Sequence, residues 1–321
     1  MFKCPKCKSK MDLPACKLCG YEVPKQNNIW ILTDMPDIVI EGDGDKYIGY
    51  EHIGEHYSGS RKYIIEERDL LFAKEISRLT GDGIFLDLAC GDGCFTVPCA
   101  SFGKKIIAGD ISCTMLSILQ KKAEKNNISL ANVTLCRMNA LDIPLEDETV
   151  QTVVANGVLH LISNPEKVIK EIYRVLKKGG AFICQDDRPG VVKETKFDNE
   201  KYNEIVNSMY RHYWDIMMGH GIMPKKFSWK FNRDAFCDLL FEKKTSKLIK
   251  RGNEYEIPLK DGFLPRFIGR GFSEQVNVPK DLHEEAINKL MNEFKQKYGE
   301  DFINITYKGI EDDILMTVYI K

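Results

Sequence analysis

The alternation of short apolar segments with helical patterns constrains the fold of this chain more than any other feature. Five apolar segments occupy residues 83–89, 105–111, 132–138, 152–158 and 180–186. The stretches between them carry apolar side chains at helical spacing, as over residues 112–126 and 164–178. Strands that alternate with helices at this spacing form right-handed β-α-β crossovers. The sequence therefore predicts an α/β protein with a doubly wound, mostly parallel sheet.

Helical patterns also flank these segments. An amphipathic helix is predicted over residues 61–79, and Asn164 with Pro165 predicts the start of a helix that Gly179 and Gly180 end. Beyond about residue 190 the alternation breaks down. The patterns that follow are helical over residues 199–218, 233–244 and 281–299 and strand-like over residues 248–259 and 314–321.

The turn after the first predicted strand lies in the segment FLDLACGDGCFT. Its alternate positions are Asp87, Ala89, Gly91 and Gly93. A Gly-rich turn between the first strand and the first helix of such a sheet lets the backbone approach a nucleotide at the helix N-terminus. A dinucleotide is disfavoured, because Thr96 replaces the third glycine of the usual pattern and the carboxylates of Asp87 and Asp92 would repel a pyrophosphate. Acidic residues favour a ligand with an ammonium and a sulfonium group.

Two later positions extend this prediction along neighbouring strands. Asp110 ends the second predicted strand, where a carboxylate can accept hydrogen bonds from both ribose hydroxyls of a nucleoside. Asn139 follows the third strand and can accept from an adenine amino group, while the Ala140 backbone N–H donates to the ring. The three groups are expected at the C-terminal ends of three adjacent strands.

These segments resemble class I S-adenosylmethionine-dependent methyltransferases, specifically the type-11 group that is similar to enzymes of ubiquinone biosynthesis. The resemblance is close over about residues 61–186 and implies a Rossmann-like core. It also implies that Asp87 and Gly91 bind the methionyl part, Asp110 the ribose and Asn139 the adenine. Ala89 departs from the family's usual glycine and Asn139 from a frequent aspartate. The predicted cofactor contacts are Asp87, Ala89, Gly91, Gly93, Asp110, Ile111, Asn139, Ala140 and Asn156.

The end of the fourth predicted strand is where the transferred methyl group should emerge. It reads ANGVLH, without the Asn/Asp-Pro-Pro-aromatic signature of family members that methylate base amino groups, so that reaction is disfavoured. Asn156 and His160 lie here. His160 is the candidate for substrate contact or proton removal, although a lone histidine is more often structural. An aromatic stripe in the C-terminal region, a lid or more simply core packing, comprises Tyr210, Tyr213, Trp214 and Met217.

The first residues contain a C-x₂-C-x₈-C-x₂-C array of Cys4, Cys7, Cys16 and Cys19. Two such knuckles present four thiolates to Zn²⁺ in a closed tetrahedral site without an open catalytic position. A redox pair or iron remains as an alternative. Residues 1–30 are too few to bury a core, so the metal would replace one. We expect a structural appendage whose loss leaves cofactor affinity within about threefold, less than 1 kcal/mol.

Four regions follow from these patterns. They are a zinc-ribbon-like knuckle over residues 1–33, an acidic connector over 34–60, the S-adenosylmethionine-binding core over 61–190, and a substrate-cover region over 191–321. The last region is expected to form an α+β cover and to include the last strands of the sheet.

Composition bounds the setting of the protein. The formal net charge is −1, and the 321 residues contain no apolar run of the ~18 residues that a membrane span needs. The start lacks the apolar region of a secretory signal, so a cytoplasmic protein with no membrane partner is expected. Seven of the eleven cysteines are scattered without regular spacing, which favours reduced thiols.

Three functions remain open at this point. A methyltransferase with a small-molecule acceptor is favoured, because the whole chain is not basic and the cover region is rich in aromatic and apolar residues. An rRNA methyltransferase is the rival, since the knuckle is similar to that of some such enzymes. Residues 222–270 also carry twelve basic against six acidic side chains. The third is a non-catalytic S-adenosylmethionine-binding subunit.

Overall fold

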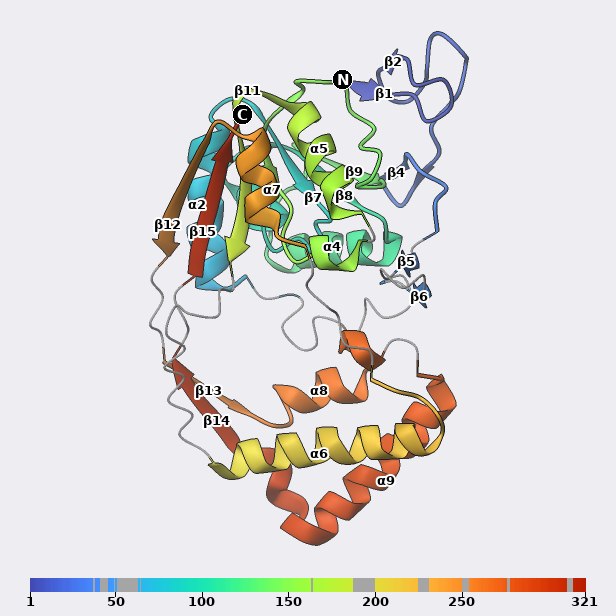
Figure 1. Cartoon of the computed structure of the whole chain (residues 1–321), viewed down its shortest axis with the longest axis vertical. Coiled ribbons are helices and arrows are strands. Elements are labelled where there is room, and N and C mark those ends of the chain that lie inside the picture. The colour runs from blue at the N-terminus through green and yellow to red at the C-terminus, as the bar shows by residue number, and fades with distance from the viewer. Residues whose placement is uncertain are drawn as a thin grey trace.

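The computed structural model shows a sheet-based upper body, which contains both chain termini, and a mainly helical lower body (Figure 1). The residues it describes are 1–36, 38–40, 46–48, 50, 63, 65–162, 164–186, 200–224, 231–249, 254–275, 278–310 and 314–321. Among the helices in these ranges, none combines the length and the apolar composition needed to cross a membrane.

The upper body is built on a sheet of nine strands in the order β12-β15-β11-β10-β7-β8-β9-β4-β3. The strands are β3 (Lys25–Gln26), β4 (Ile29–Ile31), β7 (Ile84–Leu88), β8 (Lys105–Asp110), β9 (Val133–Arg137), β10 (Val150–Val154), β11 (Leu176–Asp186), β12 (Lys243–Ile249) and β15 (Ile314–Ile320). The six from β11 to β4 are parallel, whereas β15, β12 and β3 pair antiparallel with their neighbours. The predicted doubly wound, mostly parallel sheet is confirmed.

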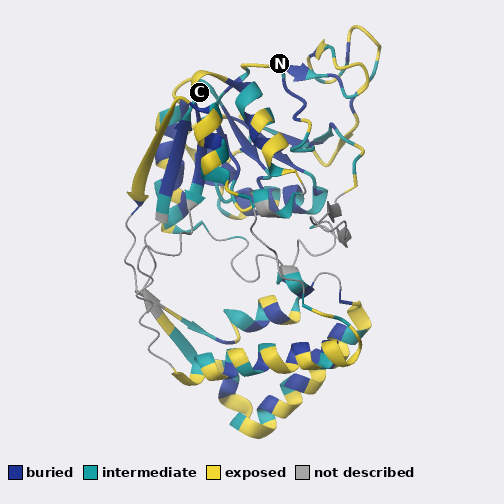
Figure 2. Ribbon diagram, in the orientation of Figure 1, coloured by how far each residue is buried: buried dark blue, intermediate teal, exposed yellow. Residues whose placement is uncertain are grey.

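Helices cover both faces of this sheet because alternate strand residues point to opposite faces. One face carries α5 (Pro165–Val175) and α7 (Arg233–Leu240), and the other carries α2 (Glu67–Thr80), α3 (Thr96–Ser101) and α4 (Cys113–Lys125). In β7, Leu86 and Leu88 pack into the hydrophobic cluster on the face of α5 and α7, and Phe85 packs into the cluster on the face of α2, α3 and α4. The central strands are consequently the most buried part of the upper body, whereas the edge strand β12 is exposed (Figure 2).

The lower body has a hydrophobic core of its own. It consists of α6 (Glu200–Gly219), β13 (Glu254–Pro258), α8 (Phe263–Ile268), α9 (Lys280–Tyr298), β14 (Thr306–Ile310) and the short turns η3 (Ser273–Gln275) and η4 (Glu300–Asn304). Tyr213, Trp214 and Met217 are buried in this core, and the ring of Tyr210 packs edge-on against Trp214. The aromatic stripe is therefore core packing, as favoured above, rather than a lid.

The N-terminal residues do not stand apart from the sheet. The knuckle carries β1 (Phe2–Lys3) and β2 (Lys10–Met11), which pair with each other, and the chain then enters the main sheet through β3 and β4. A separate pair of strands follows, β5 (Ile38–Ile40) and β6 (Lys46–Ile48). Much of the predicted connector lies outside the described residues.

Four predicted boundaries were wrong. The helix expected to end at Gly179 and Gly180 ends at Val175, and β11 begins at once, because Leu176 already pairs with Val150. Gly179, at φ +71°, instead lies where the β10–β11 register shifts. The helix predicted over 233–244 ends at Leu240, and residues 248–259 are divided between β12 and β13. The helix predicted over 61–79 begins only at Glu67, because Glu66 is its extended N-cap residue.

Candidate active site

A cavity of about 300 Å³ lies at the C-terminal ends of β7, β8, β9 and β10. Its wall takes in the turns after these strands, together with Phe95, Met115 and three residues of the N-terminal segment, Met35, Pro36 and Tyr50. Ligands of open parallel sheets bind at this edge, outside the carboxyl ends of the strands. The cavity is therefore the candidate ligand site.

The turn after β7 owes its shape to backbone conformations that few side chains allow. Gly91 and Gly93 have φ values of +54° and +80°, and Ala89 reaches +56° in spite of its side chain. A Cβ atom on Gly93 would lie 2.5 Å from Cγ of Leu119, so α4 packs too closely for any other residue there. The glycines predicted from sequence thus let the turn pass between the cavity and α4.

Asp87, the last residue but one of β7, is a buried carboxylate that lines the cavity. Its Oδ2 accepts a hydrogen bond of 2.6 Å from the Thr96 hydroxyl at the start of α3. Burial raises the pKa of Asp87 to about 7, and the neighbouring carboxylates of Asp110 and Asp92 act in the same direction, against the hydrogen bond from Thr96. A positively charged ligand would offset this cost.

Asp110 is held rigidly at the end of β8. One carboxylate oxygen accepts from the backbone N–H of Gly91 at 2.8 Å, and the other accepts from that of Ser112 at 2.9 Å. Ser112 in turn caps α4 through its side chain, which accepts from the Met115 N–H. The two turns that follow β7 and β8 are therefore joined through one carboxylate.

Asn139 marks the end of the cavity beyond β9. Its Oδ1 accepts from the Leu141 N–H at 2.9 Å, and its Nδ2 lies 2.9 Å from the sulfur of Met35. Ile111 and Ala140 also line this end of the cavity. Sequence patterns missed Met35 and Pro36, because their place depends on the β4–β9 pairing and not on a local motif.

The fourth strand delivers the remaining predicted residues. Asn156 lines the cavity after β10, with Val158 and Leu161 beside it. His160 lies in the short turn η2 (Leu159–Leu161), and its side chain is outside what the structure describes. Of the predicted cofactor contacts, all but Gly93 line the cavity; Gly93 shapes its loop instead.

The charge of the cavity wall is strongly one-sided. Asp87, Asp92 and Asp110 all line it, whereas its described lining includes no lysine or arginine. A buried cation lies close by, since Nζ of Lys122 is 3.8 Å from Asp92 Oδ2, but Lys122 does not line the cavity. The wall suits a cationic ligand and opposes a pyrophosphate.

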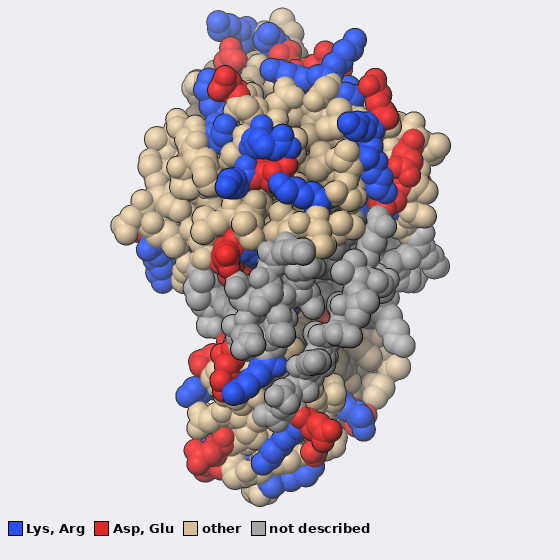
Figure 3. Space-filling model, turned by 90° about the vertical axis from the view of Figure 1, so that its left-hand side faces the viewer, with Lys and Arg blue, Asp and Glu red and all other residues tan. Residues whose placement is uncertain are grey.

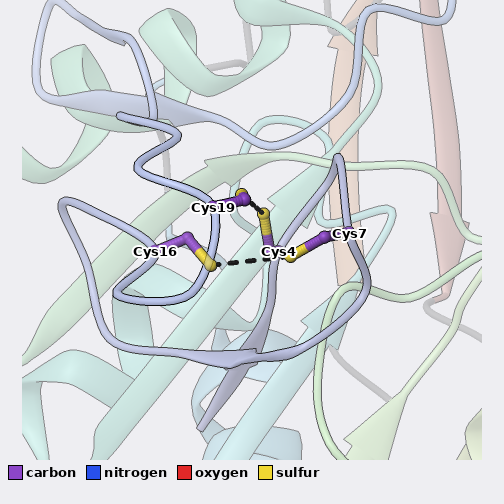
Figure 4. Close-up of side chains that lie close together, drawn as sticks. All are labelled: Cys4, Cys7, Cys16 and Cys19. Carbon is purple, nitrogen blue, oxygen red and sulfur yellow. Dashed lines mark hydrogen bonds between the residues drawn. The ribbon is translucent and has the colours of Figure 1, made fainter.

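The four N-terminal cysteines lie together on two loops of the knuckle with their sulfurs turned toward one another (Figure 4). All four sulfurs lie within 4.8 Å of each other, with Cys4–Cys19 and Cys7–Cys16 separations of 3.6 Å. A zinc tetrahedron with Zn–S bonds of ~2.3 Å has sulfur–sulfur edges of about 3.8 Å. A hydrogen bond with Ser9 lowers the pKa of Cys16 to about 6, whereas, against a hydrogen bond with the Tyr21 backbone, the contact with Cys7 and burial raise the pKa of Cys19 to about 12.

A mostly parallel sheet, a Gly-rich turn after its central strand and a carboxylate at the end of the next strand are features of class I S-adenosylmethionine-dependent methyltransferase domains. Residues 86–184 match the family model described as a methyltransferase domain. The family match covers the strands from β7 to β11, which carry most of the cavity wall.

The chain is also similar to individual proteins over about half its length. It is 36% identical over 149 residues to an uncharacterised methyltransferase-like protein of Schizosaccharomyces pombe. The aligned region covers 46% of this chain and 50% of that protein. It is 28% identical over 178 residues to a demethylmenaquinone methyltransferase of Bacillus cereus, and this aligned region covers 51% of this chain and 74% of the relative. The YcgJ protein of Bacillus subtilis aligns with a TM-score of 0.45 and 17% identity over 80% of this chain and 99% of that one.

Proposed function

We propose that this chain transfers a methyl group from S-adenosylmethionine to a small-molecule acceptor by in-line displacement. The acidic wall of the cavity carries the proposal. The cofactor has an ammonium and a sulfonium against one carboxylate, so three aspartates and no described basic lining residue favour it over a dinucleotide. A volume of about 300 Å³ lies at the lower end of the range for small-molecule sites.

Each predicted contact has a role in this proposal. Asp87 and the backbone of the Ala89–Gly93 turn would hold the methionyl part. Asp110, whose carboxylate is positioned by the backbone N–H groups of Gly91 and Ser112, would contact the ribose hydroxyls. Asn139, Ala140 and Ile111 would receive the adenine.

The chain would act on the reaction chiefly by orientation. When bound, the cofactor would supply a methyl group on a positively charged sulfur: the acceptor's lone pair would bond to the methyl carbon while the carbon–sulfur bond breaks and the sulfur leaves as a neutral thioether. Holding the two reactants in line in a site that excludes water is worth up to ~7–11 kcal/mol in well-oriented systems. Asn156 would contact the ligands at the end of β10, and we propose His160 as the proton acceptor, worth ~10²–10⁴-fold.

A small acceptor is preferred to RNA for two reasons. The Bacillus relative is named for a quinone-type small molecule. In the basic stretch over residues 222–270, Arg233, Lys244 and Lys247 form ion pairs with Asp234 and Glu75. Figure 3 shows basic and acidic side chains interspersed on the face that carries β12, which is unlike an open basic track for a phosphate backbone.

The test follows the fate of a labelled methyl group. Purified protein is incubated with methyl-tritiated S-adenosylmethionine and, in parallel, with a small-metabolite extract or total RNA, and with the Asp110→Ala variant as the control. We expect label in the low-molecular-mass fraction and loss of that label in the variant. Label in the RNA alone would establish the rival acceptor, and no transfer to either fraction by a protein that binds the cofactor would support the non-catalytic subunit.

We further propose one structural zinc ion held by Cys4, Cys7, Cys16 and Cys19. The sulfur separations support a tetrahedral site, and four protein ligands leave no open position for catalysis. Elemental analysis should find one zinc per chain. Protein that is free of metal but has four titratable, accessible thiols would contradict the proposal.

A further inference from the structure

The N-terminal segment forms part of the wall of the cofactor cavity. Met35 and Pro36 line it beside Asn139. The guanidinium of Arg137, at the end of β9, donates to the carbonyl oxygen of Met35 at 2.8 Å and to that of Ile111 at 3.0 Å. One side chain therefore fixes two opposed parts of the predicted adenine subsite, one from β8 and one from the N-terminal segment.

This segment is positioned by the sheet. β4 pairs in parallel with β9, with Ile31 opposite Arg137, and the Leu32 N–H donates to the Arg137 carbonyl at 2.9 Å. Because β4 runs parallel to β9, the residues that follow it leave the sheet at the edge where the cavity lies. Met35 reaches the cavity only if β4 keeps this register.

The knuckle docks on the segment that follows Asn139. The Lys3 N–H donates to the Pro144 carbonyl and the Glu146 N–H to the Met1 carbonyl, both at 3.0 Å, and Phe2 forms a bridge with Leu145. Five buried knuckle residues share one hydrophobic cluster with Cys136 of β9 and with Met138, Ile143 and Leu145 beyond it. The five are Phe2, Cys4, Met11, Cys16 and Val23. Two of these knuckle residues are cysteines of the proposed metal site.

A cavity of about 350 Å³ separates the rest of the knuckle from this segment, and Asn139 lines it as well as the cofactor cavity. Asn139 is thus part of a thin wall with the knuckle on one side and the cofactor cavity on the other. Displacement of the knuckle would therefore move Asn139 and Met35. The Nδ2 atom of Asn139 lies 2.9 Å from the sulfur of Met35.

We infer that the knuckle is a component of the cofactor site, so that binding of zinc to its four cysteines and binding of S-adenosylmethionine strengthen one another. This inference rests on the proposed function and on the proposed zinc ion. A knuckle of this size keeps its fold only with its metal, and the metal-free chain would lose the platform that holds Met35 and Asn139. These contacts argue against the expectation from sequence that the knuckle is an appendage independent of the cofactor site.

Reciprocity provides a test on the unaltered protein. If zinc raises the affinity for S-adenosylmethionine by a given factor, the cofactor must raise the affinity for zinc by the same factor. Zinc affinity is measured by competition with a chromophoric chelator, with and without saturating S-adenosylmethionine, and cofactor affinity by calorimetry on zinc-loaded and chelator-stripped protein. We expect at least a tenfold change in both, and equal factors within error.

Variants separate local from global effects. Cys4→Ser with Cys7→Ser should lose zinc and bind the cofactor at least tenfold more weakly, while circular dichroism shows an otherwise folded protein. Arg137→Lys keeps the charge but loses the fork that joins Met35 to Ile111, and should weaken binding in the zinc-loaded protein. The matched control is Arg78→Lys, at an exposed guanidinium outside the cavity lining, which should leave affinity unchanged.

Two failures can be told apart. Cofactor binding by zinc-loaded protein, with zinc affinity unaffected by the cofactor and affinity in the double variant within threefold, would overturn the coupling alone. Absence of S-adenosylmethionine binding by zinc-loaded wild-type protein would overturn the proposed function and the coupling with it.

Discussion

Asp87 lies in surroundings that oppose its own charge. It is buried, two further carboxylates lie near it, and the Thr96 hydroxyl is the hydrogen-bond donor that acts against them. Binding of a cation near Asp87 would offset the unfavourable free energy of its buried negative charge. The charge of Asp87 should therefore strengthen cofactor binding and lower the stability of the protein without ligand.

Cofactor affinity should depend on pH through Asp87. Its pKa of about 7 in the free protein means that the carboxyl is protonated below pH 7, and a cationic ligand must then displace that proton. Affinity should be constant above pH 7 and fall by up to about tenfold per unit below it. Calorimetry between pH 5.5 and pH 8.5 measures this. An equally steep profile in Asp87→Asn would assign it to another group.

The same substitution should stabilise the protein without ligand. Because the pKa of Asp87 rises from ~3.9 in the unfolded chain to about 7, the folded state binds more protons between these values. Stability therefore falls as pH rises through that window and remains reduced above it, by at most about 4 kcal/mol. Asp87→Asn should melt at higher temperature than wild type at pH 8 and show little difference at pH 4. A lower melting temperature at pH 8 would contradict the burial argument.

Asp110 gives a test of the ribose contact. Asp110→Ala removes a charged acceptor and leaves the N–H groups of Gly91 and Ser112 without it, so cofactor affinity should fall by ~1.5–3 kcal/mol. The matched control is Asp82→Ala, an exposed carboxylate that lies outside the cavity lining. Calorimetry showing unchanged affinity in the Asp110 variant, or tighter binding of NAD than of S-adenosylmethionine, would exclude this site.

The sequence sufficed for site residues that sit in local motifs. Asp87, Gly91 and Asp110 each follow directly from a strand-turn-helix pattern, and the structure brings them together. Met35 carried no such signal, because no spacing indicates that it meets Asn139 across more than a hundred residues. The roles of the predicted contacts, and of His160 above all, remain predictions.

At the scale of elements, the turn after β7 depends on how closely it approaches α4. Gly93 combines a positive φ with a forbidden Cβ position against Leu119, whereas Gly103 has a φ of +69° and open space around it. A side chain at Gly103 would cause backbone strain alone, whereas one at Gly93 would cause both strain and overpacking, so comparing the two positions separates these effects.

Gly93→Ala should therefore be much more harmful than Gly103→Ala. The Gly103 variant costs the strain of a side chain at positive φ, about 1 kcal/mol. At Gly93 overpacking adds about 1–3 kcal/mol and shifts the turn, so cofactor affinity should fall as well. Urea unfolding of both variants and calorimetry supply the comparison. Equal losses of stability in the two would show that α4 moves away freely.

Long elements were predictable and short ones were not. The five strands from β7 to β11 and helices α4, α6 and α9 carry enough apolar residues for the spacing of these residues to predict a strand or a helix. Strands β3 and β4 have two and three residues, and their membership of the sheet is decided by pairing with β9. The early end of α5 likewise follows from the β10–β11 pairing.

At the scale of the whole molecule, the described chain holds separate hydrophobic cores in its upper and lower bodies. One basic side chain of residues 222–270 is paired with an acid from outside that stretch, because Lys247 of β12 forms an ion pair with Glu75 of α2. We expect the balance of charge over this stretch to decide the response to nucleic acid.

RNA binding should be weak and should show a shallow salt dependence. Binding through Z phosphates of a single strand falls with log salt at a slope of about −0.7Z, so an RNA track would show a steep loss. A gel-shift titration of bulk RNA from low to physiological salt is the measurement. Tight binding at low salt with a slope steeper than about −3, which requires several phosphate contacts, would favour the RNA acceptor.

The parallel pairing of β4 with β9 also sets an order of events during synthesis. Ile29 leaves the ribosome about a hundred residues before its partner Leu135. At roughly 5–20 residues per second, the knuckle is exposed for on the order of 5–20 s before the surface it docks on exists. The proposed zinc ion would keep its cysteines folded and protected from oxidation during that interval. Newly made chains should consequently depend on zinc supply more than mature ones, a difference that pulse-labelled translation with and without a zinc chelator would detect.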